Sequence, residues 1–146
     1  MKQIKENIEN ATLGCRLGRA YQIMLGQLAV ALKAAGLDIT TNEYLVLRAV
    51  YSAPGLQQCE IVDMVGKDKA AVCRCVAAME KRNLVTTEQI SHKCLKVYPT
   101  DRSLEIKPAI EKVARERHAA LMRLTTPGDL EIFSQIIDKI IESKTQ

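Results

Sequence analysis

The segment that most constrains the fold of this chain is residues 56–98, where two short helical patterns precede a hairpin. Apolar residues at helical spacing predict a helix over residues 57–65 and a second helix that ends at Arg82, joined by a turn at Gly66. Residues 85–90 and 94–98 are predicted strands around a polar tip at residues 91–93. This order predicts a mainly α fold with a small β-hairpin wing, a winged helix-turn-helix.

The excess positive charge of the chain lies in the same segment. Residues 67–102 hold eight Lys or Arg against four acidic residues, whereas residues 1–66 balance six against six and residues 103–146 balance seven against seven. The whole formal charge of +4 therefore belongs to the helix-turn-helix and hairpin. Local cationic charge of this kind points to double-stranded DNA as the partner, because duplex phosphates form a dense polyanion.

The second helix of the pair divides into an inward and an outward face. Asp68 is expected to cap its N-terminus, and Asn83, which tolerates the left-handed conformation, is expected to end it. Val72, Val76 and Met79 repeat on the inward face. The outward face carries small residues punctuated by cations, which suits a major groove because bulky apolar groups would block the base edges. The outward residues are Lys69, Ala70, Cys73, Arg74, Ala77 and Lys81.

Helix ends are predicted from local capping patterns. The Thr40 hydroxyl can accept from the backbone N–H of Glu43, whose carboxylate can reach back to the N–H of Thr40 in a capping box. The helix that follows should bury Tyr44, Leu47 and Val50. It should end before the next Pro-Gly pair.

Long amphipathic helices are predicted at both ends of the chain. One covers residues 5–35 and stops at Gly36. Another covers residues 107–124, with Pro108 in its first turn, or begins near residue 101 with Pro108 as a kink. The last helix follows Thr126, a good N-cap.

The apolar stripes of the terminal helices are large for one small subunit to cover. Residues 38–102 can form a winged-helix core, which leaves residues 1–36 and 103–146 as dimerisation helices. Burial in a closed two-fold homodimer is the economical solution, and packing of the stripes on each other within one subunit is the alternative. The predicted interface residues are Ile8, Leu13, Leu130, Phe133 and Ile137.

Composition and spacing argue against several other classes. No apolar run approaches the roughly 18 residues that span a bilayer, and residues 1–6 lack a signal-peptide stretch, so a cytoplasmic location with no membrane partner is expected. The five cysteines are then expected to be thiols. Cys73 and Cys75 lie about 200° apart on a helix, and His92 with Cys94 supplies only two ligands, so no metal site is expected. Nothing resembles a catalytic constellation, so we expect no enzyme and no cofactor.

Five segments, taken in order, carry a resemblance to a known family of regulators. They are residues 13–20 (LGCRLGRA), 39–47 (ITTNEYLVL), 56–66 (LQQCEIVDMVG), 68–74 (DKAAVCR) and 80–85 (EKRNLV). The first resembles the family's first helix, and the others resemble the start of its winged helix, both helices of its helix-turn-helix and the entry to its wing. In this order and spacing they resemble the MarR family of winged-helix transcription regulators.

The resemblance implies a dimer of triangular outline, joined by outer helices from both chain ends. It implies a repressor that binds a pseudo-palindromic operator, with the recognition helix in the major groove and half-sites about one helical turn apart. A small-molecule effector would lodge between the dimerisation helices and the winged helix and release the DNA. Arg74 is the best candidate for bidentate contact to guanine. The implied DNA-binding residues are Lys67, Lys69, Ala70, Ala71, Cys73, Arg74, His92 and Lys93.

Three changes depart from the family's pattern. Ala70 and Ala71 replace a Ser-Thr pair, which removes two hydroxyl contacts and leaves methyl groups better suited to thymine. Cys73 replaces a Thr. The tip at residues 91–93 replaces Asp-Arg-Arg in a shorter hairpin, so a weaker minor-groove contact is expected, because Arg suits narrow grooves better than Lys.

Two alternative functions use the same fold. Some relatives sense oxidants through a cysteine near the start of the first helix, where this chain has Cys15 beside Arg16 and Arg19, cations that favour a reactive thiolate. However, Arg19 replaces the tyrosine that accompanies the reactive cysteine in those relatives, which favours a small apolar filler instead. The other alternative is a winged helix used as a protein-interaction module with no DNA function.

Overall fold

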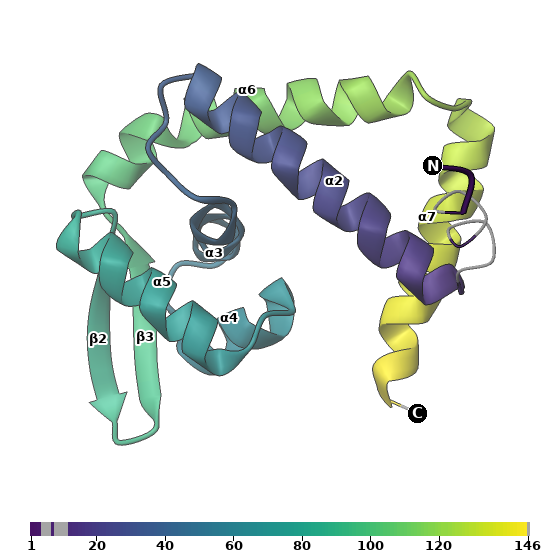
Figure 1. The fold of residues 1–146 in the computed structure, drawn as a ribbon. Helices are drawn as coiled ribbons and strands as arrows, with labels where there is room; N and C mark the ends of the chain where they lie inside the picture. The colour runs from purple at the N-terminus through teal and green to yellow at the C-terminus, as the bar shows by residue number, and fades with distance from the viewer. Residues whose placement is uncertain (4–6, 8–11, 146) are drawn as a thin grey trace.

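The computed structural model, which describes residues 1–3, 7 and 12–145, consists of a compact lobe carried on two long helices (Figure 1). These are α2 (Leu13–Ala34) and α6 (Asp101–Met122), which pack against each other beside the lobe. α7 (Pro127–Glu142) follows α6 and lies well away from the lobe. No helix in the described part of the chain is long and apolar enough to cross a membrane.

The lobe is a winged helix, as the sequence predicts. Its helices are α3 (Thr41–Ser52), α4 (Gln58–Val65) and α5 (Lys69–Lys81). Its strands β1, β2 and β3 form an antiparallel sheet in the order β1-β3-β2. Their bounds are Leu56–Gln57, Val85–Ser91 and Cys94–Pro99.

The core of the lobe forms where α3 packs against α4 and α5. The predicted inward residues of α5 are buried, and so are the three predicted on α3. α6 closes the lobe with Ile110 and Val113, which are also buried. In addition, the Tyr51 hydroxyl of α3 donates to the backbone carbonyl of Ser103 at 2.8 Å. One end of α6 therefore belongs to the lobe while the other extends beyond it.

Several predicted helix ends are confirmed. The Thr40 hydroxyl accepts from the Glu43 N–H at 3.1 Å, and the Asp68 carboxylate accepts from the Ala71 N–H at 2.7 Å. Asn83 has a φ of 57°, the left-handed conformation expected after α5. These caps satisfy N–H groups that have no partner within the first turn of a helix.

Three predicted boundaries need correction. The helix predicted over residues 5–35 is not continuous, because Thr12 is extended (φ −60°, ψ 157°) and caps α2, which begins at Leu13. Pro108 lies inside α6, so the longer of the two alternatives holds, with Thr100 as the N-cap. The tip of the hairpin is shorter than predicted, because β2 extends to Ser91 and pairs it with Cys94.

Strand β1 was not predicted. It is only two residues long, and it pairs Leu56 with Val97 of β3. A strand this short has too few residues to show alternation in the sequence. It attaches the entry to α4 to the wing.

The second half of the predicted capping box at residues 40–43 is wrong. The Glu43 carboxylate does not return to the Thr40 N–H; instead it accepts from Nη1 of Arg82 at 2.5 Å, and Glu43 is only 5% exposed. Nη2 of Arg82 donates to the backbone carbonyl of Asp38. Since Arg82 follows α5 directly, this pair holds the end of α5 against the start of α3.

Replacing Arg82 should destabilise the fold because it removes the partner of the buried Glu43 carboxylate. We expect Arg82→Met to lower the free energy of unfolding by about 1–3 kcal/mol, because Glu43 stays buried without its charged partner. Because Arg82 is partly exposed, this loss is smaller than the loss expected for a fully buried ion pair. Urea denaturation at one fixed protein concentration measures the loss.

Two further variants separate the ion pair from a general loss of charge. Adding Glu43→Gln to Arg82→Met should recover part of the stability, because a neutral amide costs less to bury than a carboxylate. Lys81→Met, an exposed neighbour, should be close to neutral. Equal effects of Arg82→Met and Lys81→Met would contradict the assignment.

Candidate nucleic-acid interface

The outward face of α5 carries the residue best suited to read a base. Arg74 is exposed, and its guanidinium makes no hydrogen bond or ion pair with any other residue that the structure describes. Lys69 and Ala70 are also exposed, whereas Ala71 is half-buried. A free guanidinium on a face of small side chains can approach guanine in the major groove.

Cys73 is less available than its position on the helix suggests. Its Sγ accepts a hydrogen bond from Nε2 of Gln58 at 2.7 Å, and the side chain is half-buried. This contact joins α5 to α4. Cys73 therefore supports the packing of the helix-turn-helix as well as facing outward.

A groove of about 630 Å³ brings the start of α5 and the wing together. Lys69 of α5 lines it with His92 and Lys93 from the hairpin tip. Among the described residues that line it, Asp63 is the only acid. Three predicted DNA-binding residues, far apart in the sequence, thus line one groove.

Two other cations of the segment face the protein itself. Arg82 is committed to Glu43, as described above. Lys67 is half-buried, and its Nζ lies 5.9 Å from the centroid of the Tyr21 ring on α2. Lys67 therefore does not line the groove, although the family resemblance had grouped it with Lys69, His92 and Lys93 as a DNA-binding residue.

Comparison with known proteins agrees with this geometry. The model of the MarR family matches residues 37–92, which include α3, the helix-turn-helix and the first strand of the wing. The winged-helix part of this chain is thus similar to the MarR family.

Similar proteins include one found by sequence and two solved structures, which share this fold over most of their length. The helix-turn-helix-type transcriptional regulator YybA of Bacillus subtilis is 21% identical over 106 residues, which are 71% of each chain. A MarR-family regulator from Listeria monocytogenes, solved with a 26mer DNA, is 18% identical with a TM-score of 0.78, over 91% of this chain and 89% of that one. PcaV from Streptomyces coelicolor, solved with its natural ligand, is 18% identical with a TM-score of 0.71, over 90% and 91%.

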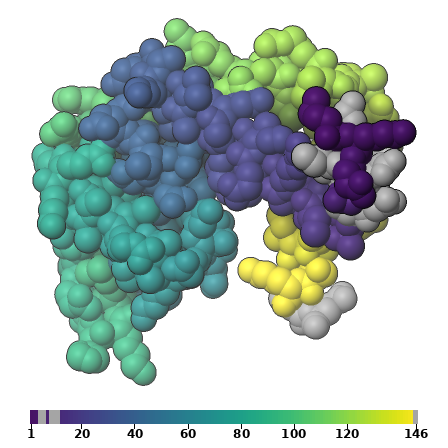
Figure 2. All heavy atoms as spheres, in the orientation of Figure 1, coloured from purple at the N-terminus to yellow at the C-terminus, as the bar shows by residue number. Residues whose placement is uncertain are grey.

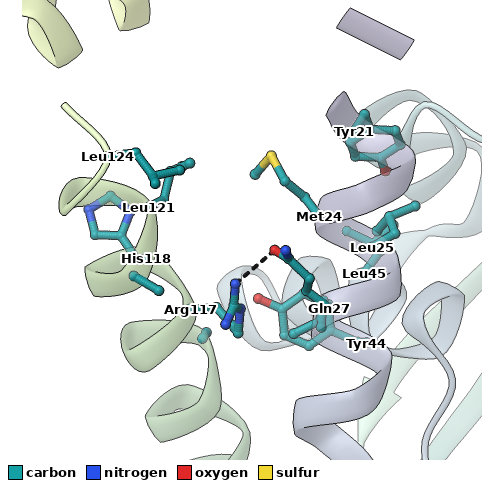
Figure 3. A pocket seen from close by; sticks show the side chains of 13 residues that line it. Tyr21, Met24, Leu25, Gln27, Tyr44, Leu45, Arg117, His118, Leu121 and Leu124 are labelled. Carbon is teal, nitrogen blue, oxygen red and sulfur yellow. Dashed lines mark hydrogen bonds between the residues drawn. The ribbon is translucent and has the colours of Figure 1, made fainter. Parts of the chain in front are cut away.

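A second candidate site lies between α2, α3 and α6 (Figure 3). It is a cavity of about 390 Å³, mostly apolar, and Tyr21, Met24 and Tyr44 line it. Arg117 reaches it from α6 and donates to Oε1 of Gln27 at 2.8 Å. No acidic side chain of the described residues lines the cavity.

The family resemblance implied a ligand site between the dimerisation helices and the winged helix, but the sequence did not identify the residues that line this cavity. Its lining comes from three helices that are separated in the chain, so no local motif marks it. His118 is exposed and also lines the cavity. Apolar residues on one face of α2 were the only available signal.

The predicted dimer-interface residues lie on surfaces that one subunit leaves largely open. Leu13 is 63% exposed and Phe133 is 49% exposed. Leu130 and Ile137 are half-buried. Ile8 lies outside the described residues.

The cysteines differ in environment. Cys15 and Cys59 are exposed, whereas Cys75 is half-buried on the inward side of α5. Burial raises the pKa of the Cys75 thiol, and the nearby negative charge of Glu43 raises it further, although Arg74 acts in the opposite direction. Cys75 should therefore be the least reactive of these three thiols.

Alkylation would test this order. A raised pKa leaves less thiolate at neutral pH, so Cys75 should react with iodoacetamide more slowly than Cys15 and Cys59, and its rate should still be rising at mildly alkaline pH. Peptide mass spectrometry of the folded protein measures the rates, and the unfolded protein serves as the control for intrinsic reactivity. Labelling of Cys75 as fast as that of Cys15 would contradict the expectation.

Proposed function

We propose that this protein is a DNA-binding transcriptional regulator of the MarR family, a homodimeric repressor that binds a pseudo-palindromic operator and is released by a small ligand. The observation that carries the proposal is the groove that Lys69 of α5 and Lys93 of the wing both line, together with the exposed Arg74 on the same helix. A base-reading side chain next to cations on two different elements is the arrangement that a recognition helix needs in a major groove.

Each part of this surface has a separate task. Arg74 would read a guanine, and Ala70 and Ala71 would present methyl groups to thymine. Lys69 and Lys93 would contact phosphates, which adds affinity without sequence information. The Listeria relative solved with a 26mer DNA supports this mode of binding.

The homodimer is supported by the exposed apolar face of α7. None of the residues of α7, all of which the structure describes, is buried. Figure 2 shows α7 separated from the lobe by a wide notch below α2. A contiguous apolar surface of this kind marks an interaction site, and a second copy covers it economically. The exposed apolar residues of α7 are Ile132, Phe133, Ile136, Ile140 and Ile141.

The ligand would occupy the cavity between α2, α3 and α6. Its apolar lining suits a small apolar body, and Arg117 can pair with an anionic group on it. PcaV, which shares the fold, is seen with its natural ligand. Release of DNA requires that the ligand bind the DNA-competent and DNA-incompetent arrangements with different affinity.

Substitutions on the two elements should separate base reading from phosphate contact. On an operator selected from random duplexes, Arg74→Ala should lose about 1–3 kcal/mol of discrimination at one base pair of each half-site. Lys93→Ala should weaken all duplexes about equally and reduce the salt dependence by about one phosphate per subunit. Fluorescence anisotropy at several salt concentrations measures both effects.

The control is Lys112→Ala on α6, an exposed cation that does not line the groove. It should leave affinity and salt dependence unchanged. If Arg74→Ala kept the full sequence preference, the proposed register of α5 on DNA would be wrong. A wild-type protein that bound duplexes without steep salt dependence would count against the proposed function itself.

Adding a charge to the apolar face of α7 should dissociate the dimer. Ile136→Glu places a carboxylate at a side chain that is 46% exposed in one subunit and would be buried in two. We expect a monomer by analytical ultracentrifugation with unchanged helicity, because burying an unpaired charge costs far more than leaving it in water. Ser134→Glu, about 200° around the same helix, is the matched control and should remain dimeric. A monomeric wild type would refute the homodimer.

A further inference from the structure

We propose that Tyr21 is a positioning residue for the recognition helix, which it holds through Lys67 although it lies on α2, outside the winged helix. The Nζ of Lys67 lies 5.9 Å from the centroid of the Tyr21 ring. This is within the range in which an ammonium is attracted to the face of an aromatic ring. The contact joins a dimerisation helix directly to the turn of the helix-turn-helix.

Lys67 lies in the turn between α4 and α5, so a small displacement of Lys67 would also move the start of α5. Gly66 before it ends α4 in the left-handed conformation (φ 69°), and its N–H donates to the Val62 carbonyl at 3.1 Å. Asp68 after it is the N-cap of α5 and accepts from the Ala71 N–H. The turn is therefore closed on both sides, and a shift of Lys67 would carry the first turn of α5 with it.

The two ends of α5 are thus held by different elements. Arg82 ties the C-terminal end to Glu43 of α3, inside the lobe. Lys67 ties the N-terminal end to Tyr21 of α2, outside the lobe. The N-terminal end carries Lys69 and Ala70, two of the residues proposed to face DNA, so its orientation affects binding most directly.

Tyr21 also lines the cavity between α2, α3 and α6 (Figure 3). A molecule in that cavity would contact the same ring that holds Lys67. This gives the cavity a route to the recognition helix, and that extension rests on the ligand response proposed above. The positioning role itself requires only a protein that binds duplex DNA.

A double-mutant cycle on the full-length protein tests the link. Tyr21→Leu and Lys67→Gln should each weaken binding to the selected operator, and the double variant should be no weaker than Lys67→Gln alone. The effect of Tyr21→Leu should be about two- to fivefold, as expected for an exposed cation–π contact. Tyr21→Phe keeps the ring and should bind like the wild type.

Amide hydrogen exchange in the absence of DNA gives a second readout. Tyr21→Leu should accelerate exchange at residues 66–71 without a matching change in α3, whereas a general loss of stability would accelerate both. Ile23→Val is the control, since Ile23 lies on the same helix, is 50% exposed and does not line the cavity. It should leave both affinity and exchange unchanged.

Opposite results would overturn the link. Strictly additive effects in the cycle, or a Tyr21→Phe variant as weak as Tyr21→Leu, would show that the contact with Lys67 does not position the turn. These outcomes would leave the proposed repressor function intact. Conversely, if the wild type selected no operator, that function would fail, and the exchange experiment alone would still decide whether Tyr21 holds the turn.

Discussion

The surface that we propose to face DNA depends on the burial of one side of α5 against α3. Val72, Val76 and Met79 are almost completely shielded from solvent. Burying each of these side chains contributes about 1.5–3 kcal/mol, which is ample to fix the helix in one rotation. Because packing fixes the inward side, the outward side can carry small residues and Arg74 without destabilising the core. Any rotation of α5 would bury its cations and expose its valines.

Charge then acts on a helix that packing has already oriented. The excess of positive charge lies in the winged helix, but its members have different partners. Arg82 neutralises a buried carboxylate and Lys67 lies against an aromatic ring, whereas Lys69 and Lys93 share a groove. The net charge of the segment explains attraction to DNA at a distance. The placement of individual cations determines which of them can touch it.

The long helices outside the lobe connect the winged helix to the cavity and to α7. α6 belongs to the lobe through Ile110 and then continues to the cavity and to α7. α2 contributes to the cavity and, through Tyr21, contacts the helix-turn-helix. The same two helices thus adjoin the proposed dimer interface, the proposed ligand site and the recognition helix. In such an arrangement, a change at one site has a short path to the others.

The sequence by itself determined the features that depend on neighbouring residues: the winged-helix order, the inward face of α5, its Asp68 cap and the left-handed Asn83. Capping and amphipathic spacing act within one helical turn, so they are visible in the chain. Only the tertiary structure decided the partners of Glu43, Cys73 and Lys67, and only it brought Lys69 to the wing. Those contacts depend on how helices cross, since that geometry brings together side chains from distant parts of the sequence.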